Sequence, residues 1–382
     1  MTFLSNQYRP SNILGAKPQH LSERSLWKRF HIDPFLLTAL LILTGMGLAI
    51  LYSASNGNKD LVMQQIIRLG LAYVVMIIVA QISPDKFKLW VPWVFIAGVL
   101  LLIAVFVAGD IGKGARRWLD LGFIRFQPSE IMKLAIPIFL AWYLQERSLP
   151  PTYRHLMACA LIIAIPVGLT AIEPDLGTAI MLACAGACVL FLSGIGWRLI
   201  IVLFALAAAA TPLLWYKMHD YQRQRVLTFL NPESDPLGAG YHIIQSKIAI
   251  GSGGIFGKGW LQGTQSHLNF LPEHATDFIF GVCGEEFGLV GGTILISAFM
   301  LIVGRGLYIS MQAQDTFTRL VAGGLSMAFF FSMFINIGMV TGILPVVGVP
   351  LPLVSYGGTS MVTLMASFGI IMSIHTHRKL LA

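Results

Sequence analysis

Long apolar runs without a charged residue recur along almost the whole chain, and they constrain its fold more than any other feature. Of 382 residues, 56% are hydrophobic and only 12% are charged, which excludes an ordinary soluble domain. Runs of this length suit helices that cross the roughly 30 Å hydrocarbon core of a bilayer. We therefore predict an all-α polytopic membrane protein with about ten transmembrane helices. The predicted spans are 35–54, 61–82, 89–108, 129–144, 155–172, 178–192, 197–215, 277–302, 320–344 and 353–374.

The membrane domain is flanked by two tails. Residues 1–34 form a polar, basic tail, residues 35–376 form the membrane domain, and residues 377–382 form a short second tail. The first apolar run is too long for the core of a signal peptide, so we expect it to remain as a helix. An even number of spans puts both tails on one side, where Lys and Arg are more numerous. The positive-inside rule then predicts that both tails are cytoplasmic.

Two basic segments fall on the predicted outer side and need an explanation. One follows the third span and contains Arg116, Arg117 and Trp118. The other is the loop 216–276, which at roughly 60 residues far exceeds an ordinary connection and is therefore expected to be functional. A polyanionic ligand on the outer face would account for both segments, whereas long loops that escape the charge rule are the alternative. Apolar side chains at positions 241, 244 and 248 predict a short helix on the membrane surface within this loop.

The chemistry of the basic segments suits phosphate groups. Guanidinium groups such as those of Arg116 and Arg117 match phosphate oxygens, and Trp118 suits a sugar ring or the membrane interface. An interfacial Trp beside arginines that bind lipid head groups is the structural alternative. The Gly-rich stretch 251–259 fails the Walker pattern, because Gly follows Lys258 where Ser or Thr is required, and this excludes nucleotide hydrolysis. It leaves either a loop of backbone donors for a diphosphate or a plain surface loop.

Several carboxylates lie at the predicted ends of spans. Glu130 and Lys133 are one turn apart on one helix face, so their charges enter the membrane together. An ion pair there predicts a functional site, with a structural pair that orients the helix as the alternative. Glu173 and Asp175 occupy the turn between the fifth and sixth spans. Asp277 falls where the long loop meets the eighth span, and partial burial near the positive end of a helix dipole can tune a carboxylate for proton transfer.

The remaining polar clusters predict no metal site. His267, Glu273, His274 and Asp277 do not match a known ligand spacing. The four cysteines all lie in apolar runs, which indicates neither a disulfide framework nor a metal site. They are Cys159, Cys184, Cys188 and Cys283.

These stretches together resemble the shape, elongation, division and sporulation family of cell-wall polymerases, most closely its RodA branch. The resemblance covers nearly the whole chain beyond the N-terminal tail. It rests on ordered blocks at 115–118, 127–130 with Lys133, 173–178, 240–242, 245–246, 263–265, 271–273, 276–278, 284–286, 350–352 and 355–360.

The resemblance implies a function and its partners. Family members have ten membrane helices and polymerise lipid II into glycan strands on the outer face of the bacterial cytoplasmic (inner) membrane, during elongation and rod-shape maintenance. A class B penicillin-binding protein supplies the transpeptidase, and membrane lipid but no nucleic acid is expected as a further partner. Asp277 matches the essential aspartate of the family, and Glu130 and Lys133 match an important pair. The family commonly has His two places before that aspartate, but Ala275 stands there and His274 precedes it, so His274 is left out of the catalytic set.

The residues and the resemblance together give a mechanistic hypothesis. Asp277 is expected to act as general base on the acceptor sugar hydroxyl, while Arg116, Arg117 and Lys258 stabilise the departing undecaprenyl diphosphate. Trp118, Glu130, Lys133, Glu173 and Asp175 are expected to bind substrate as well. A divalent cation, Mg²⁺ or Mn²⁺, could assist with the diphosphate, although no ligand set requires one. The alternatives are a transporter that flips lipid II and a membrane scaffold that recruits soluble enzymes.

Overall fold

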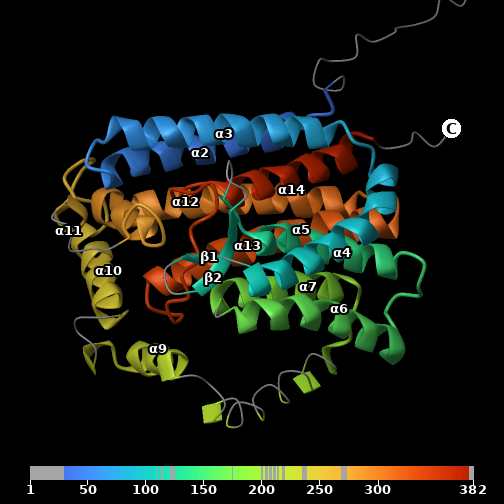
Figure 1. Ribbon diagram of the computed structural model, residues 1–382. Coiled ribbons are helices and arrows are strands. Elements are labelled where there is room, and N and C mark those ends of the chain that lie inside the picture. The colour runs from blue at the N-terminus through green and yellow to red at the C-terminus, as the bar shows by residue number, and fades with distance from the viewer. Residues whose placement is uncertain are drawn as a thin grey trace, which may run out of the picture.

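The computed structural model places most of the chain in long helices that run side by side (Figure 1). It describes residues 30–377 apart from 109, 113–114, 121–124, 174, 235–238, 268–272 and most of 199–219. Within these residues, seven helices are long and apolar enough to cross a membrane. They are α2 (Pro34–Ala54), α3 (Lys59–Ala80), α4 (Pro84–Ala108), α6 (Tyr153–Ile172), α12 (Ile279–Met311), α13 (Thr316–Val340) and α14 (Thr359–Thr376).

Two further helices, α5 (Pro128–Leu144) and α7 (Leu176–Leu192), have 17 residues each and complete the bundle. Every predicted span except 197–215 overlaps a helix, and 197–215 lies largely outside the described residues. The last two predicted spans differ in their bounds, because α13 ends at Val340 rather than at 344 and α14 starts at Thr359 rather than at 353. The prediction of an all-α polytopic membrane protein is therefore confirmed. The structure adds one small sheet in the segment after α4, which the sequence did not predict.

Helix α13 lies at the centre of the bundle, where it packs against α12, α7, α5 and α14. Of its most apolar stretch, 67% is buried inside the protein, a larger share than in any other membrane-length helix described. Two glycines permit this packing. A Cβ atom at Gly323 or Gly324 would lie 2.6 Å from Leu192 or Val189 of α7, respectively. Small residues thus let α13 and α7 approach closely, as membrane helices do where no water is available to drive their association.

Both ends of the described chain lie at one end of the bundle, which we call the terminal end. The imidazole rings of His31 and His377 stack there with their centroids 3.8 Å apart. The opposite end, the site end, holds the starts of α5, α7, α12 and α14 (Figure 1). Because α7 runs toward the terminal end and α12 starts at the site end, the segment between these two helices begins and ends at opposite ends of the bundle. This arrangement fits the even number of spans that the sequence predicts.

Asp33 anchors the terminal end. Its Oδ1 accepts the Leu36 backbone N–H at 2.9 Å and so caps α2, while its Oδ2 accepts a 2.6 Å hydrogen bond from Arg305 Nη2. His375 Nδ1 lies 2.9 Å from the same oxygen. Burial of Asp33 opposes its charged form, but the partners His375 and Arg305 outweigh burial and hold the pKa of Asp33 well below its usual range. The carboxylate therefore joins α2, α12 and α14.

We expect Asp33→Asn to lower the free energy of unfolding by about 3 kcal/mol, because the guanidinium of Arg305 loses its buried partner. Since the folded-state pKa is lowered, this stabilisation is present above the unfolded value of about 3.9 and is lost as the pH falls toward the folded value. Thermal unfolding in detergent at several pH values measures both effects. The exposed Asp85 of α4 is the matched control, and Asp85→Asn should change stability by less than about 0.5 kcal/mol. Equal effects of the two substitutions would contradict this account.

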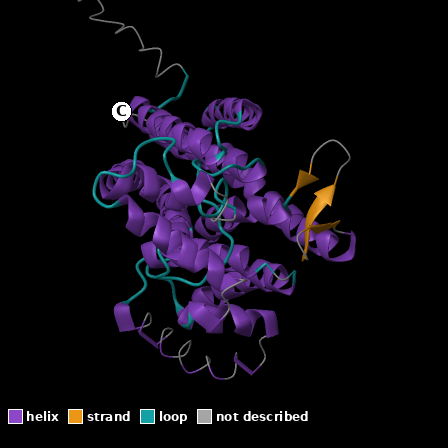
Figure 2. Ribbon diagram, turned by 90° about the vertical axis from the view of Figure 1, so that its left-hand side faces the viewer, coloured by secondary structure: helices purple, strands orange, loops and turns teal. Residues whose placement is uncertain are grey.

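The small sheet consists of β1 (Asp110–Gly112), β2 (Ala115–Asp120) and β3 (Arg125–Phe126) in antiparallel order. Its strands project from the side of the helix bundle (Figure 2). Strand β2 contacts α4 and α5, so the sheet lies next to the start of α5. The predicted basic segment therefore forms a hairpin against the bundle.

The long loop after α7 also contains regular structure, namely α9 (Asp220–Leu230), the 3₁₀ turn η1 (Pro232–Ser234), α10 (Ala239–Gly253) and α11 (Thr264–His267). Helix α10 coincides with the predicted short helix, and a different set of residues packs it against the bundle. Ile243, Ser246 and Ala249 are buried against α12 and α13, whereas Ile248 is exposed. The hydroxyl of Ser246 donates to the Val340 carbonyl at the end of α13, which fixes α10 to the bundle. The apolar face at 241, 244 and 248 is thus not the face that packs on the bundle, and its contact with the membrane surface stays a prediction.

Helix α12 is interrupted at Gly288, whose φ of 63° and ψ of −158° lie in a region that essentially only glycine occupies. With 33 residues, an unbroken helix would be roughly 50 Å long, well beyond the bilayer core of about 30 Å. The predicted start of this span at 277 is close to the observed one, but the helix ends at Met311 rather than at 302. The break separates a short first segment, 279–287, from a membrane-length second segment.

The Gly-rich stretch 253–259, which we call the glycine brace, fills the break in α12. The Lys258 N–H donates to the Glu285 carbonyl and the Leu289 N–H donates to the Gly254 carbonyl, each at 3.0 Å. A Cβ atom at Gly257 would lie 2.1 Å from the Glu286 carbonyl oxygen, so the two backbones touch. The stretch therefore packs against α12, and its predicted role as a loop of backbone donors for a diphosphate stays a prediction. Its backbone donors satisfy the carbonyls that the broken helix leaves unpaired.

Candidate functional site

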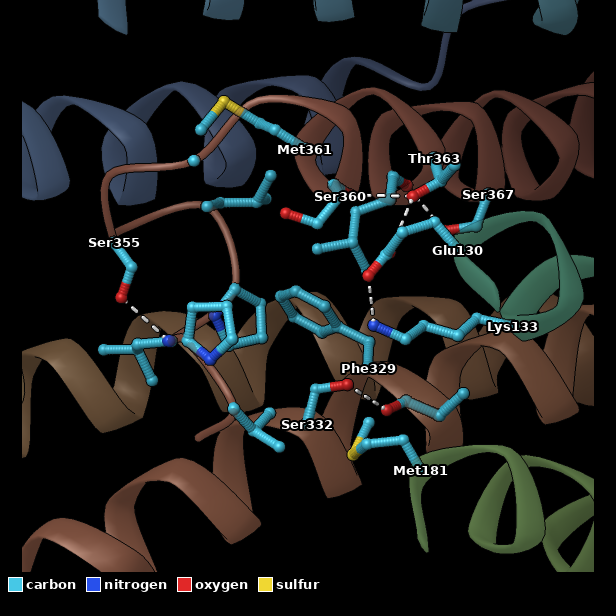
Figure 3. A pocket seen from close by; sticks show the side chains of 18 of the residues that line it. Glu130, Lys133, Met181, Phe329, Ser332, Ser355, Ser360, Met361, Thr363 and Ser367 are labelled. Atoms are coloured by element: carbon cyan, nitrogen blue, oxygen red, sulfur yellow. Dashed lines mark hydrogen bonds and ion pairs between the residues drawn. The ribbon is translucent and has the colours of Figure 1, made fainter. Parts of the chain in front are cut away.

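A pocket lies between α5, α7, α13, α14 and the segment 349–357 that precedes α14 (Figure 3). Its volume is about 60 Å³. The wall is partly apolar, with Met181, Phe329 and Pro350 among the lining residues, and partly polar. The polar lining residues are Glu130, Lys133, Ser332, Ser355, Tyr356, Ser360, Thr363 and Ser367. A polar wall within a membrane-spanning bundle suits a ligand with both polar and apolar parts.

Glu130 and Lys133 form the predicted ion pair in the first turns of α5. Lys133 Nζ lies 2.6 Å from Glu130 Oε1, and Thr363 of α14 donates to Glu130 Oε2 at 3.4 Å (Figure 3). The Glu130 side chain is 7% exposed and that of Lys133 is 25% exposed. The ammonium group is therefore the member of the pair that a ligand in the pocket reaches more easily. Glu130 holds the Lys133 ammonium group in place. If the Lys133 side chain rotated away, the buried Glu130 carboxylate would lose its charged partner, which is unfavourable.

Asp277 lies in the turn Glu273 to Phe278, just before α12, and this turn is held by backbone contacts. Asn336 of α13 donates from Nδ2 to the Asp277 carbonyl at 2.8 Å. The Tyr356 N–H donates to the Ala275 carbonyl at 2.9 Å. A Cβ atom at Gly348 would lie 3.6 Å from Asp277 Oδ2, so the carboxylate lies beside the backbone next to the pocket wall. The turn and the pocket-lining segment thus form one structural unit.

Glu173 and Asp175 lie at the start of α7, also at the site end, and both are 5% exposed. Asp175 caps the helix, since it accepts from the Thr178 N–H at 3.3 Å and from the Thr178 hydroxyl at 2.9 Å. Its Oδ2 also accepts from Gln127 Nε2 at 3.0 Å, which joins α7 to the start of α5. Gly177 packs so closely that a Cβ atom there would lie 2.4 Å from the Val347 carbonyl oxygen. Helix capping accounts for Asp175, while a substrate contact by either acid stays a prediction.

Arg116, Arg117 and Trp118 lie on β2 of the hairpin. Arg116 pairs with Ile111 and Trp118 pairs with Asp110 in the β1–β2 register. The hairpin places this basic segment at the site end, next to the start of α5. The side chains of the two arginines lie outside what the structure describes, so their contact with a diphosphate remains a prediction.

Lys258 has a different environment from the one predicted. Its Nζ lies 2.7 Å from Oε1 of Glu285, a side chain that is completely buried, and 2.9 Å from Thr264 Oγ1. Glu285 also accepts from the Gln265 N–H at 3.0 Å. The lysine charge is therefore already balanced by a carboxylate of the broken helix. A role for Lys258 in diphosphate binding stays a prediction, and a diphosphate would compete with Glu285 for the lysine ammonium group.

Sequence reasoning missed the residues that hold the Asp277 turn, above all Asn336 and Ser355. The sequence signal for Asn336 was a single Asn within an apolar run. Its hydrogen-bond partners are distant in sequence, so the sequence does not identify them. In the described part of the chain, no group of three or more His, Cys, Asp or Glu residues could hold a metal ion. The possible divalent cation on the diphosphate stays a prediction. No step below depends on a metal.

The fold and the site define a polytopic helical membrane protein with a polar pocket at one end of its bundle. Comparison with known proteins gives the family: the chain belongs to the FtsW/RodA/SpoVE family, described as "Cell cycle protein", whose model matches residues 34–380. This confirms the resemblance seen in the sequence.

Named relatives and solved structures agree with this assignment. The chain is 53% identical over 362 residues to the peptidoglycan glycosyltransferase MrdB of Escherichia coli K12, covering 94% of this chain and 98% of MrdB. It is 33% identical to the peptidoglycan glycosyltransferase RodA of Treponema pallidum, covering 91% and 98%. A chain solved in work on polymerization and crosslinking by a peptidoglycan synthase complex superposes with a TM-score of 0.79 at 34% identity, covering 90% and 97%. The rod shape determining protein RodA of Thermus thermophilus superposes with a TM-score of 0.68 at 27% identity, covering 91% and 98%.

Proposed function

We propose that this chain is a peptidoglycan glycosyltransferase, which polymerises lipid II into glycan strands on the outer face of the bacterial cytoplasmic membrane during elongation and rod-shape maintenance. The observation that carries the proposal is the place of the Asp277 carboxylate, beside Gly348 and next to the wall of the pocket that contains Glu130 and Lys133. The names of the relatives support the same activity.

The proposed reaction is a direct displacement with inversion at the anomeric carbon of the donor sugar. The acceptor 4-hydroxyl oxygen forms the new bond to that carbon, and the bond from the carbon to the diphosphate oxygen breaks. Asp277 takes the hydroxyl proton as general base, and undecaprenyl diphosphate leaves with the electron pair. Because inversion is direct, one base suffices and no covalent sugar intermediate forms. Arg116 and Arg117 are proposed to stabilise the charge on the leaving diphosphate.

Lys133 is proposed to bind substrate from the pocket, with Glu130 as its anchor. We expect Lys133→Met to lower the polymerisation rate roughly 100-fold, the typical effect of removing one preorganised donor at a reacting group. Lys133→Arg should recover part of the loss, because it keeps the charge. Initial rates of lipid II consumption measure both. The matched control is Lys88 of α4, whose ion pair with Asp315 lies at the terminal end, and Lys88→Met should leave the rate within about threefold of wild type.

The glycosyltransferase differs from its main alternative, a lipid II flippase, in what it does without a bilayer. Purified protein in detergent micelles has no second leaflet to which a lipid could move. We expect it to convert purified lipid II into glycan polymers under these conditions, as read on a gel of labelled product. Failure to form polymer, together with transfer of lipid II between leaflets in vesicles, would favour the flippase.

We further propose that a class B penicillin-binding protein crosslinks the strands that this chain makes, that the protein resides in the inner membrane, and that both tails are cytoplasmic. Support for a crosslinking partner comes from the similar chain studied in a peptidoglycan synthase complex. Support for the side of the tails comes from His31 and His377, which lie together at one end of the bundle, and from the distribution of Lys and Arg. Co-purification with the transpeptidase tests the partner.

A further inference from the structure

Asn336 is a buried amide that no part of the proposed reaction uses. It lies one turn before the end of α13, at the centre of the bundle, and is 0% exposed. Its Nδ2 donates to the Asp277 carbonyl at 2.8 Å and to the Val349 carbonyl at 2.7 Å. Both partners are carbonyl oxygens, which can only accept, so the amide nitrogen must face them.

The two partners of Asn336 belong to the two halves of the candidate site. Asp277 is the proposed base, and Val349 lines the pocket. One side chain, fixed on the most buried of the membrane-length helices described, therefore connects the base to the pocket wall. Ser355 adds a second connection, because its hydroxyl donates to the Thr276 carbonyl and accepts the Leu351 N–H at 2.8 Å.

The amide at this position combines two favourable donors with one unfavourable acceptor. Its Oδ1 is buried and accepts no hydrogen bond from the residues that the structure describes. A buried acceptor without a donor is unfavourable, but an apolar residue of similar volume would leave the Asp277 and Val349 carbonyls without the donors of the amide. The amide nitrogen donates to the backbone of the turn that holds Asp277. This indicates that Asn336 serves to fix the position of that turn.

We propose that Asn336 is a positioning residue for the glycosyl transfer, which holds Asp277 at the distance from the pocket that proton transfer requires. The inference rests on the proposed function of Asp277. Asn336 does not touch substrate, so it should affect the chemical step and leave substrate binding in place. Small displacements of a reacting group are costly, and a shift of about 1 Å can lower a rate roughly 100-fold.

Two substitutions test the proposal in detergent-purified full-length protein with lipid II. Asn336→Leu keeps the volume and removes both hydrogen bonds, so we expect kcat to fall roughly 10- to 100-fold while KM stays within about threefold. Asn336→Asp keeps the shape, and only its protonated form carries one O–H donor. Its kcat relative to that of wild type should therefore rise as the pH falls. Ser326→Ala is the control, since Ser326 is buried on the same helix and, among the described residues, its hydroxyl donates to the Ala322 carbonyl of that helix.

The outcomes separate this inference from the function on which it rests. Wild-type kcat in folded Asn336→Leu, a loss confined to KM, or a ratio for Asn336→Asp that does not depend on pH would each overturn the positioning role. If Asn336→Leu does not fold, the pH dependence of Asn336→Asp decides. Absence of polymer from the wild-type protein would instead overturn the proposed glycosyltransferase function itself.

Discussion

Asp277→Asn should abolish glycan polymerisation, with a fall of roughly 1,000-fold or more in the rate at which purified protein consumes lipid II. The substitution keeps the size of the side chain. The backbone contacts of the turn, from Asn336 and Tyr356, do not involve that side chain and remain. The ability to accept a proton from the sugar hydroxyl is lost. The expected loss is therefore in kcat, while the protein keeps its thermal unfolding temperature within a few degrees.

Glu233→Gln provides the control for Asp277→Asn. Glu233 is an exposed carboxylate in η1 of the same long loop, so the substitution removes the same charge from the same region. We expect wild-type polymerisation from this variant. Polymer of normal length from Asp277→Asn would remove the proposed base from the mechanism, whatever the other residues do.

Gly288→Ala should destabilise the protein by about 2–6 kcal/mol, the second large effect that the structure predicts. Alanine is strained at the φ and ψ of Gly288, and its Cβ would lie 2.4 Å from the Gly257 nitrogen and 2.6 Å from the Ile255 carbonyl oxygen. Those atoms belong to the glycine brace and cannot move without breaking its hydrogen bonds to α12. Thermal unfolding of the purified protein measures the loss.

Gly304→Ala is the matched control on the same helix. A Cβ atom at Gly304 meets nothing within 4 Å, and the residue lies in the regular second segment of α12. Alanine is a better helix former than glycine, so stability should rise by up to about 1 kcal/mol. The two alanine substitutions in one helix are thus expected to change the free energy of unfolding in opposite directions. If Gly288→Ala were as well tolerated as Gly304→Ala, the brace would not hold the break in α12.

The positions of the helices could be predicted from the sequence because a bilayer leaves few choices. A backbone in hydrocarbon must satisfy its own hydrogen bonds, so long apolar runs become helices. The pairing of Glu130 with Lys133 was also predictable, since residues three apart on a helix are neighbours. Both inferences use only local spacing.

The glycine brace and the contacts of Asn336 could not be predicted, because both depend on residues far apart in sequence. Nothing in the run that contains Asn336 shows that its amide meets a turn 59 residues earlier. Gly288 reads as one of several small packing residues, and its positive φ emerges only when the brace is placed against it. The assignment of Asp277 as the base came from the family resemblance, whereas residue chemistry alone indicated a carboxylate that could be tuned.

The central claim is that the Asp277 carboxylate is reached from the outer face of the membrane and lies next to bound lipid II. Labelling of Asp277→Cys with a membrane-impermeant maleimide tests it directly, with the native cysteines, none of which is exposed, as background. We predict labelling in right-side-out vesicles, protection by added lipid II, and no labelling of Asp85→Cys in the same vesicles. Labelling of Asp277→Cys only in inverted vesicles, or labelling that lipid II leaves unchanged, would contradict the account.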